Sequence, residues 1–308
     1  MIVVTGDYGQ FGNRLIVFAN MIATAREHGI RIANPAFHEY AGFFEATRRD
    51  VLCRYPAARV PLPGGNAARR TVHRTVLRMQ RYAKKFHHRT GRWPPLLHVL
   101  DIGWRTPCNI DAEPFLHLAR GRGILLTKGW LYRAQTTFQK HADAIRRFFT
   151  PVSTHRENVA ATLDRVRHRA EVVVGVHIRH GDYKSYLGGR FFYEVDQYAW
   201  LMRQVCGLFA GRRVGFLVCS NASMPDGAFG DLDIAFGPGH VLEDMLSLAA
   251  CDYVIGPPST YTMWASFCGQ VPLCTIANPE RAPDMDDFRI VRDCMRTTRD
   301  WLTTPVAV

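Results

Sequence analysis

Short apolar runs alternate along the chain with longer segments whose apolar residues recur every three or four positions. The first run, at residues 2–5, precedes an amphipathic segment at 13–28 and a second run that ends at Pro35. This order predicts a strand, a helix and a strand, which is typical of α/β proteins. The same patterns predict further strands at 123–128, 172–178, 214–220, 231–236, 253–256 and 273–276. They predict further helices at 67–88, 135–149, 193–209, 242–250, 260–269 and 288–301.

Apolar runs separated by helices indicate parallel sheets that are covered on both faces. A length of 308 residues is enough for about two such domains. We place the boundary so that one α/β domain covers residues 1–160 and the other covers 161–308. The glycine at position 29 is expected to end the first helix, because glycine readily adopts the left-handed conformation found there.

The composition favours a cytoplasmic protein. No apolar run approaches the ~18 residues that a membrane span needs, and the sequence begins without the basic region and apolar core of a signal peptide. The eight cysteines form no C-x-x-C pair, so we expect reduced thiols and no zinc site. Asp231 and Asp233 form a D-x-D triplet, but it lies in or beside a predicted strand and is not a convincing metal-binding loop.

The positive charge is concentrated in one segment. The chain has 39 Lys and Arg against 27 Asp and Glu, and eleven of the basic residues lie at 51–100, where no acidic residue occurs. Most of them fall in the predicted helix at about 67–90. This helix is either a solvated surface helix or a contact for an anionic membrane, at its inner face, or for a polyanionic glycan. A specific nucleic-acid contact is not expected, because interleaved aromatic residues are few.

Three polar segments interrupt the core pattern. In the first, the predicted strand at 172–178 is followed by Arg179 and Asp182. Ligands of open α/β sheets bind beyond the carboxyl ends of strands, and a guanidinium is suited to a diphosphate. The alternative is a surface loop with an ion pair between Arg179 and Asp182.

The second segment is the turn that leads into Ser259 and Thr260 at the start of a predicted helix. Hydroxyl side chains at this position cap a helix, and the same N-terminus favours an anion. The third is the glycine-rich turn between the first strand and helix, with glycines at 6, 9 and 12. Its spacing is not that of a dinucleotide site, and no acidic residue closes the second strand.

Together these segments resemble the α-1,2-fucosyltransferase family and its α-1,6- and protein O-fucosyltransferase relatives. The family's G-G-x-G-N-Q turn appears as GQFGNR, with Arg14 in place of Gln. Its H-x-R-R-G-D-Y signature appears as HIRHGDY, with His180 in place of the second Arg. Its third signature, an acidic residue, an apolar helix, a Cys and S-T-F-x-x-W, is matched by Asp244, Cys251, Ser259, Thr260, Tyr261 and Trp264.

The resemblance implies a GT-B-like fold, with two Rossmann-like domains that face each other across a cleft. The N-terminal domain would serve the acceptor, and the C-terminal domain would bind the nucleotide-sugar. It also implies an inverting transfer from GDP-fucose to an oligosaccharide or lipid-linked glycan, with no cofactor and no obligatory metal. The linkage implied is α-1,2.

The resemblance also implies a role for individual residues. Arg179 would hold the β-phosphate and neutralise the departing GDP, and Asp182 is the candidate base. The remaining donor-binding residues would be Asn13, His177, Asp244, Ser259, Thr260 and Tyr261, with His177 and Asp244 near the guanosine. The donor and acceptor cleft would include Gly9, Gly12, Arg14, His180 and Tyr183.

Two alternatives remain. Because His180 removes a permanent charge from the phosphate site, the donor could be another GDP-sugar. A non-catalytic protein that binds a glycan or a polyanion could keep the same fold and the basic helix.

Overall fold

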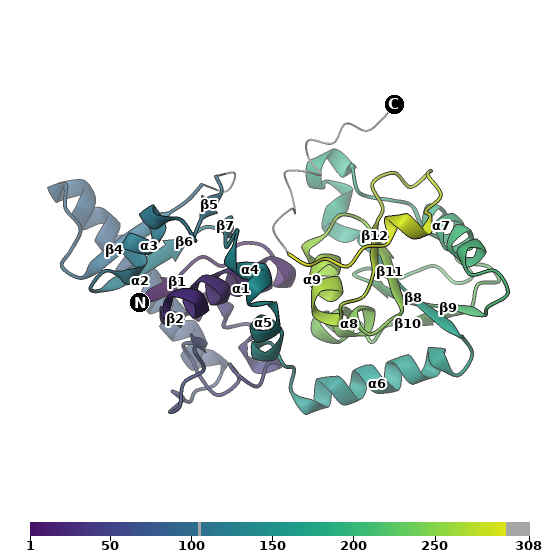
Figure 1. Cartoon of the computed structure of the whole chain (residues 1–308), viewed down its shortest axis with the longest axis horizontal. Coiled ribbons are helices and arrows are strands. Elements are labelled where there is room, and N and C mark those ends of the chain that lie inside the picture. The colour runs from purple at the N-terminus through teal and green to yellow at the C-terminus, as the bar shows by residue number, and fades with distance from the viewer. Residues whose placement is uncertain (104–105, 294–308) are drawn as a thin grey trace. The chain divides into compact units, whose positions relative to one another are not determined.

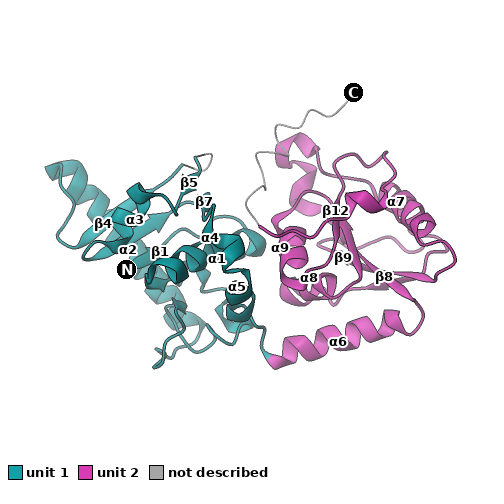
Figure 2. Ribbon diagram, viewed as in Figure 1, with its two compact units in different colours: residues 1–152 teal, residues 153–308 magenta. Residues whose placement is uncertain are grey.

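The computed structural model describes residues 1–103 and 106–293. The chain divides into two compact units, residues 1–152 and residues 153–308 (Figure 2). The boundary expected at residue 160 falls within helix α6 (Ser153–Arg167), which packs on the second unit. Within the described residues, no helix is both long and apolar enough to cross a bilayer. The seven cysteines in that part of the chain are free thiols.

The first unit is built on a five-stranded sheet. Its order is β3 (Arg54–Tyr55), β2 (Ile32–Ala33), β1 (Ile2–Val4), β6 (Ile124–Lys128) and β4 (Leu97–Asp101). All neighbours are parallel except β2 and β3. A small separate sheet pairs β5 (Cys108–Asn109) with β7 (Tyr132–Arg133).

Helix α1 (Phe11–His28) forms the centre of this unit (Figure 1). Phe18 lies against the rings of Phe37, Phe148 and Phe149 at centroid distances of 5.3–5.6 Å. Gly29 ends the helix with φ 64°, as expected from the sequence. The other helices are α2 (Asn66–Thr90), α3 (Glu113–Arg120), α4 (Thr137–Lys140) and α5 (Ala142–Phe148), with 3-10 turns η1 (Pro35–Phe37) and η2 (Ala41–Phe43). The helix predicted at 135–149 is thus divided at His141.

Helix α2 buries a face that is largely polar. Its buried side chains are Arg69, His73, Gln80 and Ala83, a spacing of four, seven and three residues. These positions recur at the period of a helix. The face is polar because Gln80 and His73 contact Thr5 at the end of β1. The Thr5 hydroxyl donates to Gln80 Oε1 at 2.9 Å, and His73 Nε2 lies 3.1 Å from the Thr5 carbonyl oxygen.

The second unit has a five-stranded sheet that is parallel throughout. Its order is β10 (Ile234–Phe236), β9 (Val214–Ser220), β8 (Val172–Ile178), β11 (Tyr253–Gly256) and β12 (Leu273–Thr275). The remaining elements are α7 (Val195–Leu208), α8 (Val241–Ala249), α9 (Thr260–Gly269) and the 3-10 turns η3 (Gly181–Lys184), η4 (Tyr186–Gly189) and η5 (Met285–Asp287).

Alternate residues of β8 face opposite layers. Val172, Val174 and Val176 join the core cluster that includes Tyr198 and Met202 of α7. On the other face, Gly175 lies so close to α8 that a Cβ would be 2.7 Å from Leu248. The parallel sheet is therefore covered on both faces, as the apolar runs predict.

The strand order reverses at β8, since β9 lies on one side of it and β11 on the other. Ligands of open α/β sheets bind at such a switch point, beyond the carboxyl ends of the strands. In this unit those ends carry Arg179 and Ser259. The end of the described chain departs from the prediction, because residues 288–293 are not helical and Arg289 pairs with Leu273. Residues 294–301 of that predicted helix lie outside the described residues.

Candidate active site

The end of β8 directs two functional side chains to one face of the sheet. His177 and Arg179 are two residues apart, so they alternate onto the same side as α8 and α9. Arg179 is mostly buried, with 13% of its side chain exposed. Its guanidinium donates two hydrogen bonds to the carboxylate of Asp182, at 3.0 and 2.9 Å. It also lies 5.2 Å from the ring centre of Tyr183.

His177 is 4% exposed and stacks on Tyr261, with ring centroids 4.9 Å apart. Burial, with a further contribution from the positive charge of Arg179, lowers the pKa of His177 to about 3. The imidazole is therefore neutral at physiological pH. Its Nδ1 is buried and has no hydrogen-bond partner among the described residues.

Helix α9 begins beside the end of β8. Ser259 is its N-cap, and its hydroxyl oxygen accepts the N–H of Tyr261 at 3.1 Å. Thr260 follows as the first helical residue and is partly exposed. The phenol of Tyr183 donates to the carbonyl of Pro258 at 2.8 Å and thereby joins the Arg179 turn to the α9 N-terminus. A fixed guanidinium beside a helix N-terminus is a favourable environment for an anion.

A pocket of about 300 Å³ lies at the carboxyl ends of β9 and β10. Asp244 contributes its only carboxylate, Phe236 is 51% exposed at the rim, and residues 220–224 supply polar backbone and hydroxyl groups. Gly237 is required here, because a Cβ would lie 2.6 Å from Asp244 Oδ1. The volume and the mixed lining are typical of a small-molecule site.

Asp244 is itself 7% exposed and accepts the backbone N–H of Gly239 at 2.9 Å. Burial, and secondarily the negative charge of Glu243, raise the pKa of Asp244 to about 6, although the Gly239 hydrogen bond opposes this shift. The carboxylate is thus ionised at neutral pH and protonated in mild acid. Tyr261 fixes the same region by donating its hydroxyl to the Val241 carbonyl at 2.8 Å.

His180 faces a different set of neighbours from Arg179. Its Nε2 lies 2.8 Å from the Tyr193 carbonyl oxygen, and its ring lies 4.6 Å from that of Phe192. Its backbone N–H donates to the side chain of Asn221 at 2.9 Å. These contacts fix the turn that carries Arg179.

The glycine-rich turn of the first unit positions Asn13. Gly9 has φ 68°, and a Cβ there would lie 2.1 Å from Asn13 Nδ2, so the close approach requires glycine. Gly12 is buried within α1. The Arg14 side chain is held within this unit, by the Ala36 carbonyl at 3.2 Å and by Glu39 at 2.8 Å.

A much smaller recess, of about 10 Å³, lies at the carboxyl ends of β1, β2 and β6, where the strand order of the first unit reverses. It is lined by Gly6, Tyr8, Arg14, Asn34 and Trp130 among others. Asn34 is 3% exposed, and its Oδ1 has no hydrogen-bond partner among the described residues.

Known fucosyltransferases are similar to this chain in sequence and in fold. No family model matches the chain. A galactoside α-(1,2)-fucosyltransferase 1 of Homo sapiens is 28% identical over 96% of this chain and 72% of its own length. The structure of Arabidopsis thaliana FUT1 in complex with GDP covers 92% of this chain and 71% of its own, with a TM-score of 0.58 and 14% identity. The fucosyltransferase NodZ from Bradyrhizobium covers 89% and 95%, with a TM-score of 0.52 and 18% identity, and NodZ crystals have been soaked with GDP-fucose.

The chain is thus similar to fucosyltransferases over almost its whole length. The structural matches confirm the expected α/β, GT-B-like fold class. Within the second unit, the structure brings Arg179, Asp182, His177, Tyr183 and the start of α9 together at one switch point. Asp244 lies in the adjacent pocket, whereas Gly9, Gly12, Asn13 and Arg14 belong to the first unit.

Several site residues were not found by sequence reasoning. Phe236 ends a predicted strand, and Gly237 and Asn221 directly follow predicted strands, which is the signal that could have identified them. The residues able to hold a metal ion, His155, His240 and Glu243, were missed because His155 is distant in sequence from the other two. They adjoin the Asp244 pocket, since Gly239 lines that pocket and precedes His240.

Proposed function

We propose that this protein is a fucosyltransferase, which moves fucose from GDP-fucose to a hydroxyl of a glycan acceptor. The observation that carries the proposal is the convergence of Arg179, the α9 N-terminus and the Asp244 pocket at one sheet edge. Arg179 and the α9 N-terminus offer positive charge that suits a diphosphate. The Asp244 pocket has a size and polarity that suit a nucleoside. The human relative, which is named a fucosyltransferase, supports the same donor. So do two structural neighbours, one in complex with GDP and one soaked with GDP-fucose.

Asp244 suits recognition of guanine. An ionised carboxylate accepts two hydrogen bonds, and guanine presents two adjacent donors, N1–H and the 2-amino group. Adenine lacks this pair of donors at the corresponding edge. The exposed ring of Phe236 at the pocket rim offers a surface on which a base can stack.

Arg179, Ser259 and Thr260 suit the diphosphate. As the bond between the anomeric carbon and the β-phosphate oxygen breaks, negative charge accumulates on GDP. The guanidinium, the Ser259 and Thr260 hydroxyls and the N–H groups of the first turn of α9 can stabilise that charge. We infer that the reaction needs no obligatory metal, because these groups supply the positive potential that a divalent cation would provide.

The chemistry is written as a single displacement. The acceptor oxygen attacks the anomeric carbon, GDP departs from the opposite face, and the acceptor proton passes to a base or to solvent. This sequence inverts the anomeric configuration. By analogy with the human relative, we propose an α-1,2 linkage to a galactoside, on an oligosaccharide or a lipid-linked glycan, with the first unit on the acceptor side.

Asp182 remains the nearest carboxylate to Arg179. Both of its oxygens accept hydrogen bonds from the Arg179 guanidinium, and its side chain is 49% exposed. A carboxylate held in this way is better suited to positioning the guanidinium than to removing a proton. We therefore assign Asp182 a positioning role.

We also propose that α2 attaches the protein to the cytoplasmic face of an anionic membrane. The exposed side chains of this helix include Arg70, Arg74, Arg78, Arg81 and Lys85, beside the exposed apolar residues Met79 and Tyr82. Cationic residues beside apolar ones favour anionic headgroups.

The transfer reaction is tested with GDP-fucose and a galactoside, in the presence of EDTA, followed by linkage analysis of the product. We expect an α-1,2-fucosylated product that forms at the same rate with and without EDTA. Preferential transfer from another GDP-sugar, such as GDP-mannose, would show that this sugar nucleotide is the donor instead of GDP-fucose. Binding of glycan without transfer from any GDP-sugar would contradict the enzymatic proposal and favour the non-catalytic alternative.

A further inference from the structure

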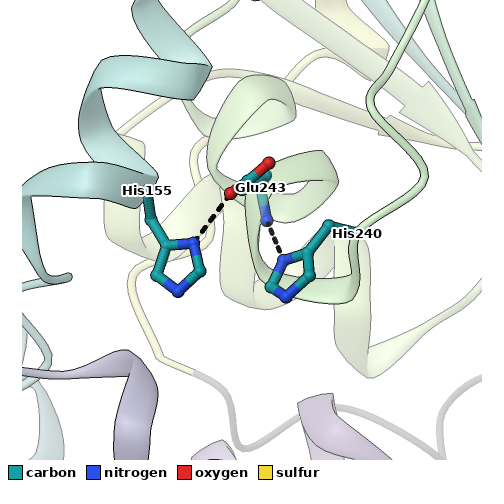
Figure 3. A group of neighbouring side chains, drawn as sticks. All are labelled: His155, His240 and Glu243. Atoms are coloured by element: carbon teal, nitrogen blue, oxygen red, sulfur yellow. Dashed lines mark hydrogen bonds and ion pairs between the residues drawn. The ribbon is translucent and has the colours of Figure 1, made fainter.

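A separate cluster of ionisable side chains lies at the N-terminus of α8 (Figure 3). His240 is the N-cap, and its Nδ1 accepts the N–H groups of Leu242 and Glu243 at 3.3 and 3.4 Å. Glu243 is 7% exposed, and its Oε1 lies 2.8 Å from Nδ1 of His155 in the first turn of α6. The two imidazole rings are nearly parallel, with centroids 4.9 Å apart.

This arrangement approaches the geometry of a metal site. His155, His240 and Glu243 each offer one ligand atom, and these atoms all lie within 4.8 Å of one another. Zinc holds nitrogen and oxygen ligands at about 2.0–2.2 Å, so tetrahedral ligands lie roughly 3.4 Å apart. Shifts of less than about 1 Å in each side chain would reach that spacing, with a coordination position left for water.

We propose that His155, His240 and Glu243 bind a divalent transition-metal ion of the zinc type. Two imidazoles and one carboxylate suit zinc or cobalt, whereas magnesium and calcium prefer ligand sets made of oxygen. The site is distinct from the Arg179 diphosphate site, so its ion has no part in the transfer reaction. Its role is to fix α6 against α8 and to hold the loop at 237–240, which lines the nucleotide pocket.

The surroundings prepare these side chains for coordination. The Asn158 amide donates to Glu243 Oε1 at 2.8 Å and orients the carboxylate, as outer-shell partners of metal ligands do. Coordination requires an ionised carboxylate and an unprotonated nitrogen on each imidazole. His155 can coordinate through Nε2 while its Nδ1 donates to Glu243. His240 accepts two N–H groups at Nδ1, so its coordination requires either the loss of these two long contacts or the loss of the proton on Nε2.

The test is a titration of the metal-free full-length chain with Co²⁺, followed by visible absorption spectroscopy. We expect one equivalent of Co²⁺ to produce the intense d–d bands of four-coordinate cobalt, and one equivalent of Zn²⁺ to abolish them. Zn²⁺ should also raise the melting temperature, because an ion that binds only the folded state stabilises it. These readouts do not depend on GDP or on fucosyl transfer, so failure here would leave the proposed function untouched.

Three variants locate the site. His155→Ala, His240→Asn and Glu243→Gln should each weaken Co²⁺ binding by at least about 100-fold, since removal of an outer-shell partner alone typically costs 10–100-fold. Asn is as effective a helix cap as any residue, so His240→Asn removes the imidazole and keeps the cap. His168→Ala removes an exposed imidazole just after α6 and serves as the matched control.

Three results would overturn the proposal. One is the absence of a saturable four-coordinate Co²⁺ spectrum. Another is equal Co²⁺ affinity in His240→Asn, Glu243→Gln and His168→Ala. The third is a thiolate-to-cobalt charge-transfer band at one equivalent, which would assign the ion to cysteine.

Discussion

Arg179 is the residue on which the proposed chemistry depends most. Its guanidinium is buried at the end of β8, next to the α9 N-terminus. Arg179→Ala should lower kcat/KM about 10²–10³-fold, the usual effect of losing one group that stabilises developing negative charge. GDP affinity should fall as well, while circular dichroism should show an intact fold.

Arg169→Ala is a matched control for that variant, because Arg169 is an exposed arginine of the same unit, paired with Asp233 at 2.9 Å. It should retain parental turnover. Near-parental kcat/KM in Arg179→Ala, measured by initial rates of GDP release, would show that Arg179 does not assist the leaving group.

The ion pair of Asp182 leads to a different prediction. If Asp182 only positions Arg179, Asp182→Asn should weaken GDP binding by about 10-fold, or ~1.4 kcal/mol. This is less than the ~2–5 kcal/mol lost when a buried charge pair is broken, because the Asp182 side chain is 49% exposed. The pH profile of kcat should keep its shape. Loss of the acidic limb of that profile, with unchanged GDP affinity, would instead identify Asp182 as the base.

Asp244 should make GDP binding depend on pH. Its pKa of about 6 means that at pH 5 roughly one molecule in ten carries the carboxylate, so GDP affinity should fall about 10-fold between pH 7.5 and pH 5. The diphosphate also titrates in this range. In Asp244→Asn, the pH dependence of GDP affinity comes from the phosphates alone, so calorimetry on this variant and on the parent separates the effect of the carboxylate. An equal pH dependence in both proteins would contradict the assignment.

The same raised pKa affects stability. A carboxyl whose folded-state pKa lies above its unfolded value destabilises the folded state at high pH, and the penalty disappears as the pH falls from about 6 toward 4. Asp244→Asn should therefore unfold at a higher temperature than the parent at pH 7.5. The free energy of unfolding should rise by about 1–3 kcal/mol.

At the scale of elements, strand and helix positions were largely predictable from periodicity. β8, β9, β11 and α9 have the predicted bounds, because each is an apolar run closed by turn residues. Helix α6 was not predicted, since few of its residues are apolar and it contacts α8 through scattered positions. Helix α2 lies close to its predicted range, but its buried face is largely polar, because Gln80 and His73 contact Thr5 where periodicity assumes apolar packing.

The basic face of α2 gives a prediction at this scale. Replacing Arg74, Arg78 and Arg81 by Glu should abolish sedimentation with anionic vesicles, because juxtamembrane basic residues contribute about 1 kcal/mol each. All three side chains are exposed, so the melting temperature should change little. Neutral vesicles are the control, and failure of the parent protein to bind anionic vesicles would rule out this attachment.

At the scale of the molecule, both units place polar residues at the point where their strand order reverses. The strand-end clusters at Arg179 and Ser259 were predictable, because polar residues directly follow buried strands. The partners of these clusters in the second unit were less predictable, since Asn221 and Phe236 become neighbours of the site only through tertiary packing. The boundary between the two units lies at residue 152 and not at residue 160, because α6 packs on the second unit.

The central claim is that the second unit binds a guanine nucleotide through Arg179, Asp244 and the α9 N-terminus. The most direct test is calorimetric titration of the whole protein with GDP, UDP and ADP in the presence of EDTA. We predict micromolar binding of GDP and at least about 100-fold weaker binding of UDP and ADP, since unpaired polar groups in the pocket penalise the wrong base. Equal affinity for the three nucleotides, or no binding of GDP, would contradict the account.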